Sequence, residues 1–326
     1  MKLGVDIGGT KTAAVILQDD GEVAVLRTAP SGHGPDRVIE VAVRLAREAM
    51  AAAGSGATPS SIGACMPGLV DRQTGRVRHA VNLGVDHIDL AARLGGALGR
   101  PVCVDNDVKA AALGTHHWLA REGIAPRGNG GTGPQPRHSL AYLNLGTGLA
   151  AALVRDGEVL RGPDGSLGEI GHLPMGGEAR CGCGQWGCLE TLVSGSALER
   201  IWPSAGPVRG DPFEAAKEGD RAAAAACAQL CSGLFLAVQM LALTTGADRI
   251  VVGGGLTGLG ARLQSGLLDE MKRREQASGF VASLHLASRV ELLAPNIPVG
   301  AMGAALLRPP SLPVPARPPH ASEVPA

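Results

Sequence analysis

One imidazole and three thiols lie close together between residues 168 and 195. They provide one nitrogen and three sulfurs, the donor set of a closed tetrahedral zinc site. Glycines between the cysteines permit the tight turns that such a site needs. Alternatively, the thiols are buried small side chains or disulfide partners, but three clustered thiols cannot pair evenly among themselves. We therefore expect structural zinc, with four ligands: His172, Cys181, Cys183 and Cys188.

Two carboxylates, Glu169 and Glu190, flank this cluster. Carboxylates are a minority among zinc ligands where thiolates are available, so we expect these two to face something else. An ionised carboxylate accepts hydrogen bonds from neighbouring hydroxyls, which makes a polyol a good candidate. Two solvated surface glutamates are the alternative.

The composition limits the classes to which the chain can belong. Its 326 residues are long for one core, so we expect two lobes. A formal net charge of zero gives no electrostatic reason to expect nucleic acid or an anionic membrane as partner. We expect no apolar run of membrane-spanning length and no signal peptide, and hence a soluble, cytoplasmic protein. The remaining cysteines are expected to be reduced core residues: Cys65, Cys103, Cys227 and Cys231.

A glycine turn follows the first predicted strand, Leu3 to Ile7. Gly8 and Gly9 would let backbone amides approach a phosphate, Thr10 would add a hydroxyl donor, and Lys11 follows. At the end of the strand, Asp6 could hold Mg²⁺ through water. Taken alone, this pattern also describes an ordinary hairpin.

The same pattern occurs again half a chain later. IGGTKTAAVILQDDGEV begins at Ile7, and LGTGLAAALVRDGEV begins at Leu145. Both run from a strand through a glycine turn into a second strand, then through Asp-Gly into a third. The repeat predicts two lobes of like fold, each with a phosphate-binding hairpin facing a shared cleft. Shared strand composition without duplication is the alternative.

Two further predicted strands end in residues that could do chemistry. Pro101 to Val104 leads to Asp105, Asn106 and Asp107 at the sheet edge, where open α/β sheets place their chemistry. Asn106 could orient a hydroxyl, and Asp107 could also be only the N-cap of the helix that begins there. Arg249 to Val252 leads to a glycine run that could lie against an adenine ring and its ribose, or could be a plain loop: Gly253, Gly254 and Gly255.

Helices are expected over 35–53, 89–98 with Asp89 as its cap, and 222–245. Residues 121–137 are rich in Gly and Pro without a hydrophobic period, which predicts a mobile insertion. The proline-rich segment 308–326 is expected to be a disordered tail.

These motifs resemble the ROK family of sugar kinases and repressors, within the actin-like ATPase superfamily. DIGGTK at Asp6 and LGTG at Leu145 resemble the two phosphate motifs, and GGG at Gly253 resembles the adenosine motif. VDNDVKAAALG, from Val104, is similar to the segment with the catalytic aspartate. The most specific match is GEIGH followed by CGCGQWGCLE, which the family uses to bind sugar and zinc.

The resemblance implies an α/β fold with two actin-like (ribonuclease-H-like) lobes, a cleft between them and a zinc-binding loop. The N-terminal lobe would cover 1–118 and the C-terminal lobe 119–307, with the last helix, about 299–307, packing back on the N-terminal lobe. The implied sugar contacts are Asn106, Asp107, Glu169, His172 and Glu190, with weaker matches at Gly68 and Asn82. The implied nucleotide contacts are Asp6, Gly8, Gly9, Thr10, Lys11, Gly146, Thr147, Gly148, Gly253, Gly254 and Gly255.

The implied activity is ATP-dependent phosphorylation of a hexose, foremost glucose at its 6-hydroxyl, with Asp107 as general base and Mg²⁺ and structural zinc as cofactors. Polyphosphate is the alternative donor. The alternatives in function are an N-acylhexosamine kinase or fructokinase of the same family and, in another class, a non-catalytic sugar-binding regulator.

Only five residues precede Asp6, so no DNA-binding segment is expected, and the family implies a homodimer. The chain departs from the family pattern at Ala150 to Ala152, where glycines are usual, and at Lys109, where a small residue is usual.

Overall fold

The computed structural model describes residues 1–54, 58–124, 139–162, 165–203 and 210–310. The expectations for residues 125–137 of the insertion and 311–326 of the tail concern residues outside these ranges.

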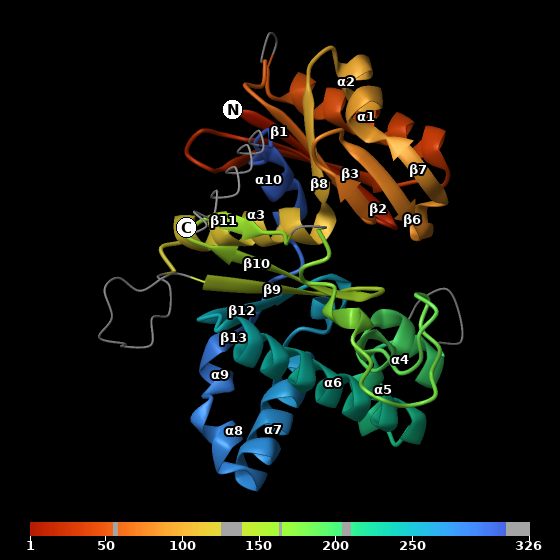
Figure 1. The fold of residues 1–326 in the computed structure, drawn as a ribbon, viewed down its shortest axis with the longest axis vertical. Coiled ribbons are helices and arrows are strands. Elements are labelled where there is room, and N and C mark those ends of the chain that lie inside the picture. Colours follow the sequence, from red (N-terminus) through yellow and green to blue (C-terminus); the bar gives the residue numbers. More distant parts are fainter. Residues whose placement is uncertain (55–57, 125–138, 163–164, 204–209, 311–326) are drawn as a thin grey trace, which may run out of the picture.

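Within the described residues, the chain forms two lobes, each built on a five-stranded sheet (Figure 1). The first sheet contains β1 (Lys2–Ile7), β2 (Lys11–Leu17), β3 (Val23–Pro30), β4 (Ile62–Met66) and β8 (Val102–Asn106). The second contains β9 (Ser139–Leu145), β10 (Leu149–Arg155), β11 (Glu158–Leu160), β12 (Arg249–Gly253) and β13 (Val290–Leu292).

The two sheets have the same topology. Their strand orders are β3-β2-β1-β4-β8 and β11-β10-β9-β12-β13. In each, three antiparallel strands are followed by two parallel ones, and a glycine turn joins the first pair of strands. The sequence repeat therefore corresponds to a repeat of the fold, and the predicted α/β architecture with two lobes is confirmed.

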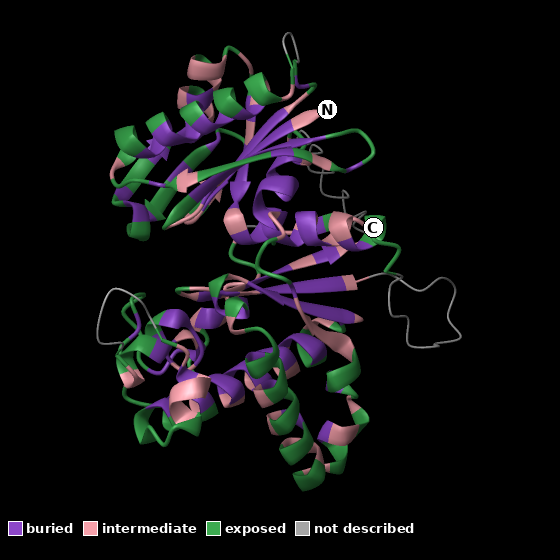
Figure 2. Cartoon of the chain, turned by 180° about the vertical axis from the view of Figure 1, so that it is seen from behind, coloured by how far each residue is buried: buried purple, intermediate pink, exposed green. Residues whose placement is uncertain are grey.

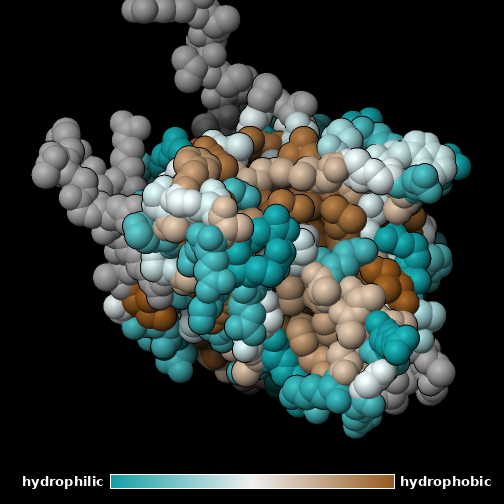
Figure 3. All heavy atoms as spheres, turned by 90° about the horizontal axis from the view of Figure 1, so that it is seen from below, coloured by the Kyte–Doolittle hydropathy of each residue, from teal (hydrophilic) through white to brown (hydrophobic). Residues whose placement is uncertain are grey.

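Helices cover the outer faces of both sheets, and Figure 2 shows the central strands largely buried, whereas the edge strand β3 is mostly exposed. The N-terminal lobe has α1 (Pro35–Ala52) and α2 (Leu90–Leu98). The C-terminal lobe has α4 (Gly195–Ile201), α5 (Pro212–Lys217), α6 (Arg221–Thr245), α7 (Ala261–Ala277), α8 (Gly279–Ser283) and α9 (Leu286–Arg289). The end of the C-terminal lobe exposes hydrophobic residues among hydrophilic ones (Figure 3). Three large apolar side chains are exposed on α6, α7 and α8 of this lobe: Leu243, Leu268 and Phe280.

Helix α6 corrects one expectation from the sequence. Its 25 residues are long and apolar enough to cross a bilayer by length and composition alone. Leu234 and Phe235, however, are fully or almost fully buried in the core of the C-terminal lobe. The apolarity of α6 therefore reflects contact on several sides within that lobe.

Two helices lie between the sheets (Figure 1): α3 (Asp107–Arg121) and α10 (Val299–Ala305). Helix α10 packs on β1, β2 and β4 and against α3, while α3 also packs on β9 and β10. Glycines make this close packing possible. A Cβ atom on Gly4 of β1 would lie 2.0 Å from the carbonyl oxygen of Ala301, and one on Gly63 of β4 would lie 1.8 Å from that of Ala304. The backbone of α10 thus rests directly on the first sheet.

A third, three-stranded sheet was not expected from the sequence. It contains β5 (Leu69–Asp71), β6 (Arg76–Ala80) and β7 (Val85–Asp89). These strands are short and have only one buried face, as the burial of Val77 and Ile88 between exposed neighbours shows. Asp89 precedes α2 without capping it, because its carboxylate pairs with Arg76 instead. The sheet forms the rim of the cleft next to Gly68.

We predict that Gly63→Ala destabilises the protein, because the new methyl group would collide with the backbone of α10. Overpacking of this kind costs about 1–3 kcal/mol. Gly96→Ala is the matched control, since Gly96 is exposed within α2 and nothing lies near its Cβ position. Alanine there should increase stability by about 0.5–1 kcal/mol. Urea denaturation measures both, and equal stability of Gly63→Ala and wild type would contradict the packing described.

Candidate active site and metal centre

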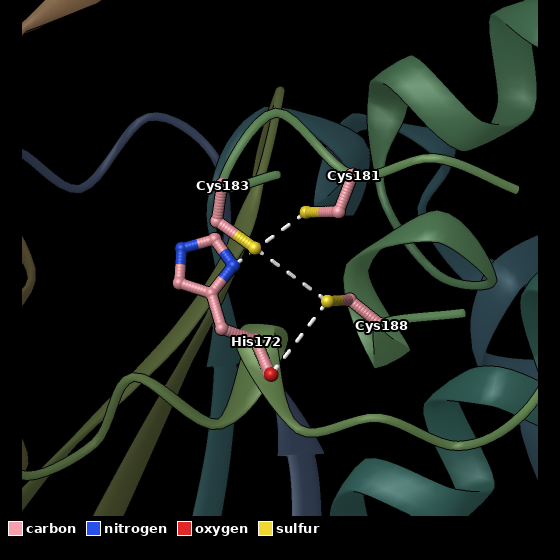
Figure 4. Close-up of side chains that lie close together, drawn as sticks. All are labelled: His172, Cys181, Cys183 and Cys188. Carbon is pink, nitrogen blue, oxygen red and sulfur yellow. Dashed lines mark hydrogen bonds between the residues drawn. The ribbon is translucent and has the colours of Figure 1, made fainter. Parts of the chain in front are cut away.

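The four predicted zinc ligands converge on one point (Figure 4). Their donor atoms all lie within 4.8 Å of one another. Cys183 Sγ is 3.7 Å from Cys188 Sγ, and Cys181 Sγ is 3.6 Å from His172 Nδ1. Two zinc–sulfur bonds of about 2.3 Å at the tetrahedral angle end about 3.8 Å apart, and a sulfur and a nitrogen ligand end slightly closer. The donor set and its spacing therefore fit a tetrahedral zinc ion.

The orientation of His172 leaves its second ring nitrogen available. Nδ1 points toward the sulfurs, and the other nitrogen lies on the opposite edge of the ring (Figure 4). An imidazole can therefore bind a metal with one nitrogen and hydrogen-bond a ligand with the other.

Backbone contacts fix the GEIGH segment to strand β10. Ala151 N donates to Gly168 O at 2.7 Å, and a Cβ on Gly168 would lie 1.9 Å from Ala151 O. A Cβ on Gly171 would lie 2.0 Å from Leu149 O. Both glycines are thus needed for this close approach, and the segment between them holds Glu169 over the start of β10.

Glu190 connects the metal cluster to the second glycine turn. Its Oε2 accepts a hydrogen bond from Leu149 N at 2.8 Å, and its Oε1 lies 3.8 Å from Cys181 Sγ. A Cβ on Gly148 would lie 2.4 Å from Oε2. One oxygen of this predicted sugar contact is thus bound to the protein itself, next to the predicted phosphate motif.

Asp6 and Asp107 form a half-buried acidic pair. The Asp6 carboxylate lies against Gly300 of α10 and accepts a hydrogen bond from Cys65 Sγ at 3.3 Å. Burial raises the pKa of Asp6 to about 6. Burial and the charge of Asp6 raise the pKa of Asp107 to about 7, and Glu169 adds to this increase. These carboxylates lie close enough to repel one another, as expected where a cation or a proton is to be bound.

Asn106, and not Asp107, caps helix α3. Its side-chain oxygen accepts hydrogen bonds from the backbone N–H groups of Val108 and Lys109. Its side-chain nitrogen donates to Gly68 O at 3.3 Å. The cap therefore leaves the Asp107 carboxylate free for another role.

Gly68, Asn106 and Glu169 line one cavity of about 400 Å³ between the lobes. This volume lies within the range of roughly 300–1,000 Å³ of small-molecule sites. The carboxylate of Glu169 makes no hydrogen bond or ion pair within the described residues, so it is available to a ligand. Asn82 lies beside the first glycine turn, where a Cβ on Gly9 would be 3.2 Å from its own Cβ.

The two glycine turns are alike in structure. Gly8 N donates to Lys11 O and Gly146 N to Gly148 O, each at 3.1 Å. Thr10, Lys11 and Thr147 are exposed at the tips. The glycine run after β12 lies against the second turn, since a Cβ on Gly254 would be 2.5 Å from Leu145 O. Backbone amides at such turns can bind phosphate groups.

The sequence analysis gave no binding role to six charged residues of this cavity; it placed Asp105 at the sheet edge and noted Lys109 only as a departure from the family pattern. The six are Asp71, Arg72, Arg78, Asp105, Lys109 and Arg161. Arg72 and Arg161 both approach the buried carboxylate of Asp105. Asp105 could have been suspected from its place beside Asn106, but nothing in the sequence brings the two arginines to it.

The chain is similar in sequence and fold to known sugar kinases. The chain is 31% identical over 284 residues to a glucokinase of Halalkalibacterium halodurans, a match that covers 80% of the chain and 82% of that protein. It superposes with a TM-score of 0.72 on a ROK hexokinase from Thermus thermophilus, at 32% identity, covering 94% of this chain and 97% of the other. A ROK family glucokinase from Streptomyces griseus in complex with glucose and AMPPNP gives a TM-score of 0.70 at 25% identity, covering 94% and 98%.

The family model described as the ROK family matches residues 2–308, a range that includes nearly all of the described fold. With this match and the relative at 31% identity, the chain belongs to the ROK family.

Proposed function

We propose that this protein is an ATP-dependent kinase that transfers the γ-phosphoryl group to the 6-hydroxyl of a hexose, with glucose as the first candidate. The observation that carries the proposal is the half-buried Asp107, whose pKa is raised by desolvation, by Asp6 and by Glu169. Asp107 lies near Asp6, the candidate magnesium ligand, and near Glu169, the candidate hydroxyl-binding carboxylate. The similarity to a glucokinase and to a glucokinase structure with glucose and AMPPNP supports both the reaction and the sugar.

On the acceptor side, Asp107 takes the proton of the attacking hydroxyl. A general base is most effective when its pKa lies near the working pH, and such assistance is worth ~10²- to 10⁴-fold in rate. Glu169, His172, Glu190 and Asn106 would hold the other hydroxyls, with weaker contacts from Gly68 and Asn82. Glu169 is unpaired, and the second nitrogen of His172 points away from the metal cluster.

On the donor side, the glycine turns would bind the phosphates of ATP, and the run from Gly253 to Gly255 would lie against its nucleoside. Asp6 would hold Mg²⁺, which supplies positive charge to the transferring phosphoryl group. The burial of Asp6 fits this role, because a buried carboxylate with a raised pKa is stabilised in its ionised form by a cation.

Zinc at His172, Cys181, Cys183 and Cys188 would be structural. Its effect on function follows from the contacts of the loop: Cys181 lies next to Glu190, and His172 belongs to the same segment as Glu169. A fixed metal cluster would hold these hydroxyl-binding groups in place before the sugar binds.

The family further implies a homodimer in the cytoplasm. The exposed apolar side chains of Leu243, Leu268 and Phe280 offer a surface for such contact. None of the seven cysteines forms a disulfide, as expected in a reducing compartment. Sedimentation velocity measures the assembly directly, and a single species of 33.0 kDa would exclude the dimer.

The substrate is tested with ATP, Mg²⁺ and a panel of glucose, N-acetylglucosamine, N-acetylmannosamine, mannose and fructose, with polyphosphate as a second donor. We expect glucose to give the highest kcat/KM. The same carboxylates could bind an N-acylhexosamine or fructose, so a clear preference for one of these would replace glucose within the same mechanism. Sugar binding without turnover of any panel member would favour a non-catalytic sugar-binding regulator.

Asp107→Asn should keep sugar binding and lose about 10²- to 10⁴-fold in kcat. The base must be deprotonated to act, so the wild-type kcat/KM should rise with pH through about 7 and level off above it. Bound Mg²⁺ would move this midpoint downward because it stabilises the ionised form. Near-normal turnover of Asp107→Asn would remove this residue from its role.

Elemental analysis of the purified protein should find one zinc per chain. Cys181→Ser should lose zinc and weaken glucose binding, because Glu190 would no longer be held. Cys227→Ser is the matched control, since Cys227 is also buried but lies in α6, far along the chain from the cluster. Active wild-type protein without zinc would contradict the structural metal site.

A further inference from the structure

Four cationic side chains line the wall of the sugar cavity, and the proposed function uses none of them. Arg72, Arg78, Lys109 and Arg161 share the cavity of about 400 Å³ with Gly68, Asn106 and Glu169. Arg72 and Arg78 come from the small sheet and the turn within it, Lys109 from the first turn of α3, and Arg161 from the C-terminal lobe. The two lobes therefore bring positive charge together beside the acceptor sugar.

The carboxylate of Asp105 neutralises only part of this charge. Its Oδ2 accepts hydrogen bonds from Arg161 Nε at 3.1 Å and Nη2 at 2.6 Å. The same oxygen lies 3.1 Å from Arg72 Nε, which is buried and makes no hydrogen bond within the described residues. One buried carboxylate thus faces two guanidinium groups, and one positive charge remains.

Lys109 adds a second uncompensated charge. Its side chain is 5% exposed, and its Nζ donates to the backbone oxygen of Gly165 at 2.6 Å. The described part of the chain provides no other partner for this ammonium group and no carboxylate within ion-pair distance. An ammonium group has three donors, and a buried charge without a counter-charge is costly. A bound anion would relieve this cost.

The remaining charged groups of the described lining are one cation, Arg78, and two carboxylates, Asp71 and Glu169, so a net positive charge persists. Arg78 is exposed on β6 and has no acidic partner among the described residues. Asp71 is engaged in its own turn, where it accepts hydrogen bonds from Gln73 N and from the hydroxyl of Thr74. Glu169 is the one other carboxylate of the described lining, and the proposed function assigns it to the sugar hydroxyls.

We propose that this side of the cavity is an oxyanion subsite that binds a phosphate group through Lys109, Arg78 and Arg72, next to the acceptor sugar. The described lining has four cationic side chains and three carboxylates, so it keeps a net positive charge that suits an anion, and the tetrahedral oxygens of phosphate can accept hydrogen bonds from several directions. The group can come from free phosphate or from a phosphorylated sugar. The second source rests on the proposed function, because it requires the sugar to lie against Asn106 and Glu169.

The test is calorimetric titration of the full-length, zinc-containing protein at 0.15 M chloride, without nucleotide. The ligands are inorganic phosphate, glucose 1-phosphate, glucose 6-phosphate and glucose. Lys109→Gln should weaken binding of the phosphate-bearing ligand by about tenfold or more, the usual effect of removing a charged hydrogen bond. Arg78→Gln, which changes an exposed residue and so leaves the fold intact, should weaken it in the same direction.

Lys217→Gln is the matched control, because it removes the same charge from an exposed lysine of α5 in the other lobe. It should leave every affinity unchanged, and glucose should bind equally well to all variants. Loss of phosphate binding in Lys109→Gln would identify free phosphate as a source. Loss confined to the sugar phosphates would identify a phosphorylated sugar.

Absence of binding by all three phosphate-bearing ligands, or equal affinities in Lys109→Gln, Arg78→Gln and wild type, would overturn the proposal. Neither result would affect the proposed kinase activity, which is measured as turnover of neutral sugars. Conversely, absence of kinase activity would not bear on phosphate binding in the cavity, which the titration measures separately.

Discussion

The close contact of α10 with the first sheet and with α3 is the constraint on which the site depends. This contact requires glycine at Gly4, Gly63 and Gly303, because a Cβ at any of them would lie 2.0 Å or less from a backbone oxygen. The same helix brings Gly300 against the carboxylate of Asp6. Asp6 lies on β1, and α3 begins at Asp107, so packing that fixes α3 and β1 relative to each other also fixes these two carboxylates. Their mutual repulsion is maintained by rigid packing, which is how raised pKa values persist in folded proteins.

The C-terminal lobe completes the site through a long loop whose only helical segments over 168–194 are two single 3-10 turns, Ile170–His172 and Leu189–Thr191. Gly168 and Gly171 place GEIGH on β10, Glu190 binds the backbone of the second glycine turn, and the metal ligands close the loop on itself. At Ala151, one of the departures from the family pattern, the backbone N–H donates to Gly168 O at 2.7 Å, and the residue is buried. This residue therefore belongs to the contact that holds the loop on β10.

Local patterns in the sequence predicted much of this structure. The repeat at Ile7 and Leu145 predicted two like lobes, and the spacing of His172 and the three cysteines predicted the cluster, because these signals lie in neighbouring residues or in a duplication. The small sheet over 69–89 was missed because its strands are three to five residues long with one buried face. The meeting of Arg72, Asp105 and Arg161 was missed because it depends on how the lobes come together. The sequence analysis predicted that Asn106 binds a sugar hydroxyl. It did not predict that Asn106 caps α3, because that role depends on where the helix begins.

The central claim is that the sugar's 6-hydroxyl lies at Asp107 while its other hydroxyls are held by groups on the zinc loop. The most direct measurement is a crystal structure of the protein with glucose and a non-hydrolysable ATP analogue. The account predicts the 6-hydroxyl within hydrogen-bond distance of the Asp107 carboxylate and facing the γ-phosphoryl group, with Glu169 and His172 on other hydroxyls. Glucose bound with its 6-hydroxyl away from Asp107, or without contact to the zinc loop, would contradict it.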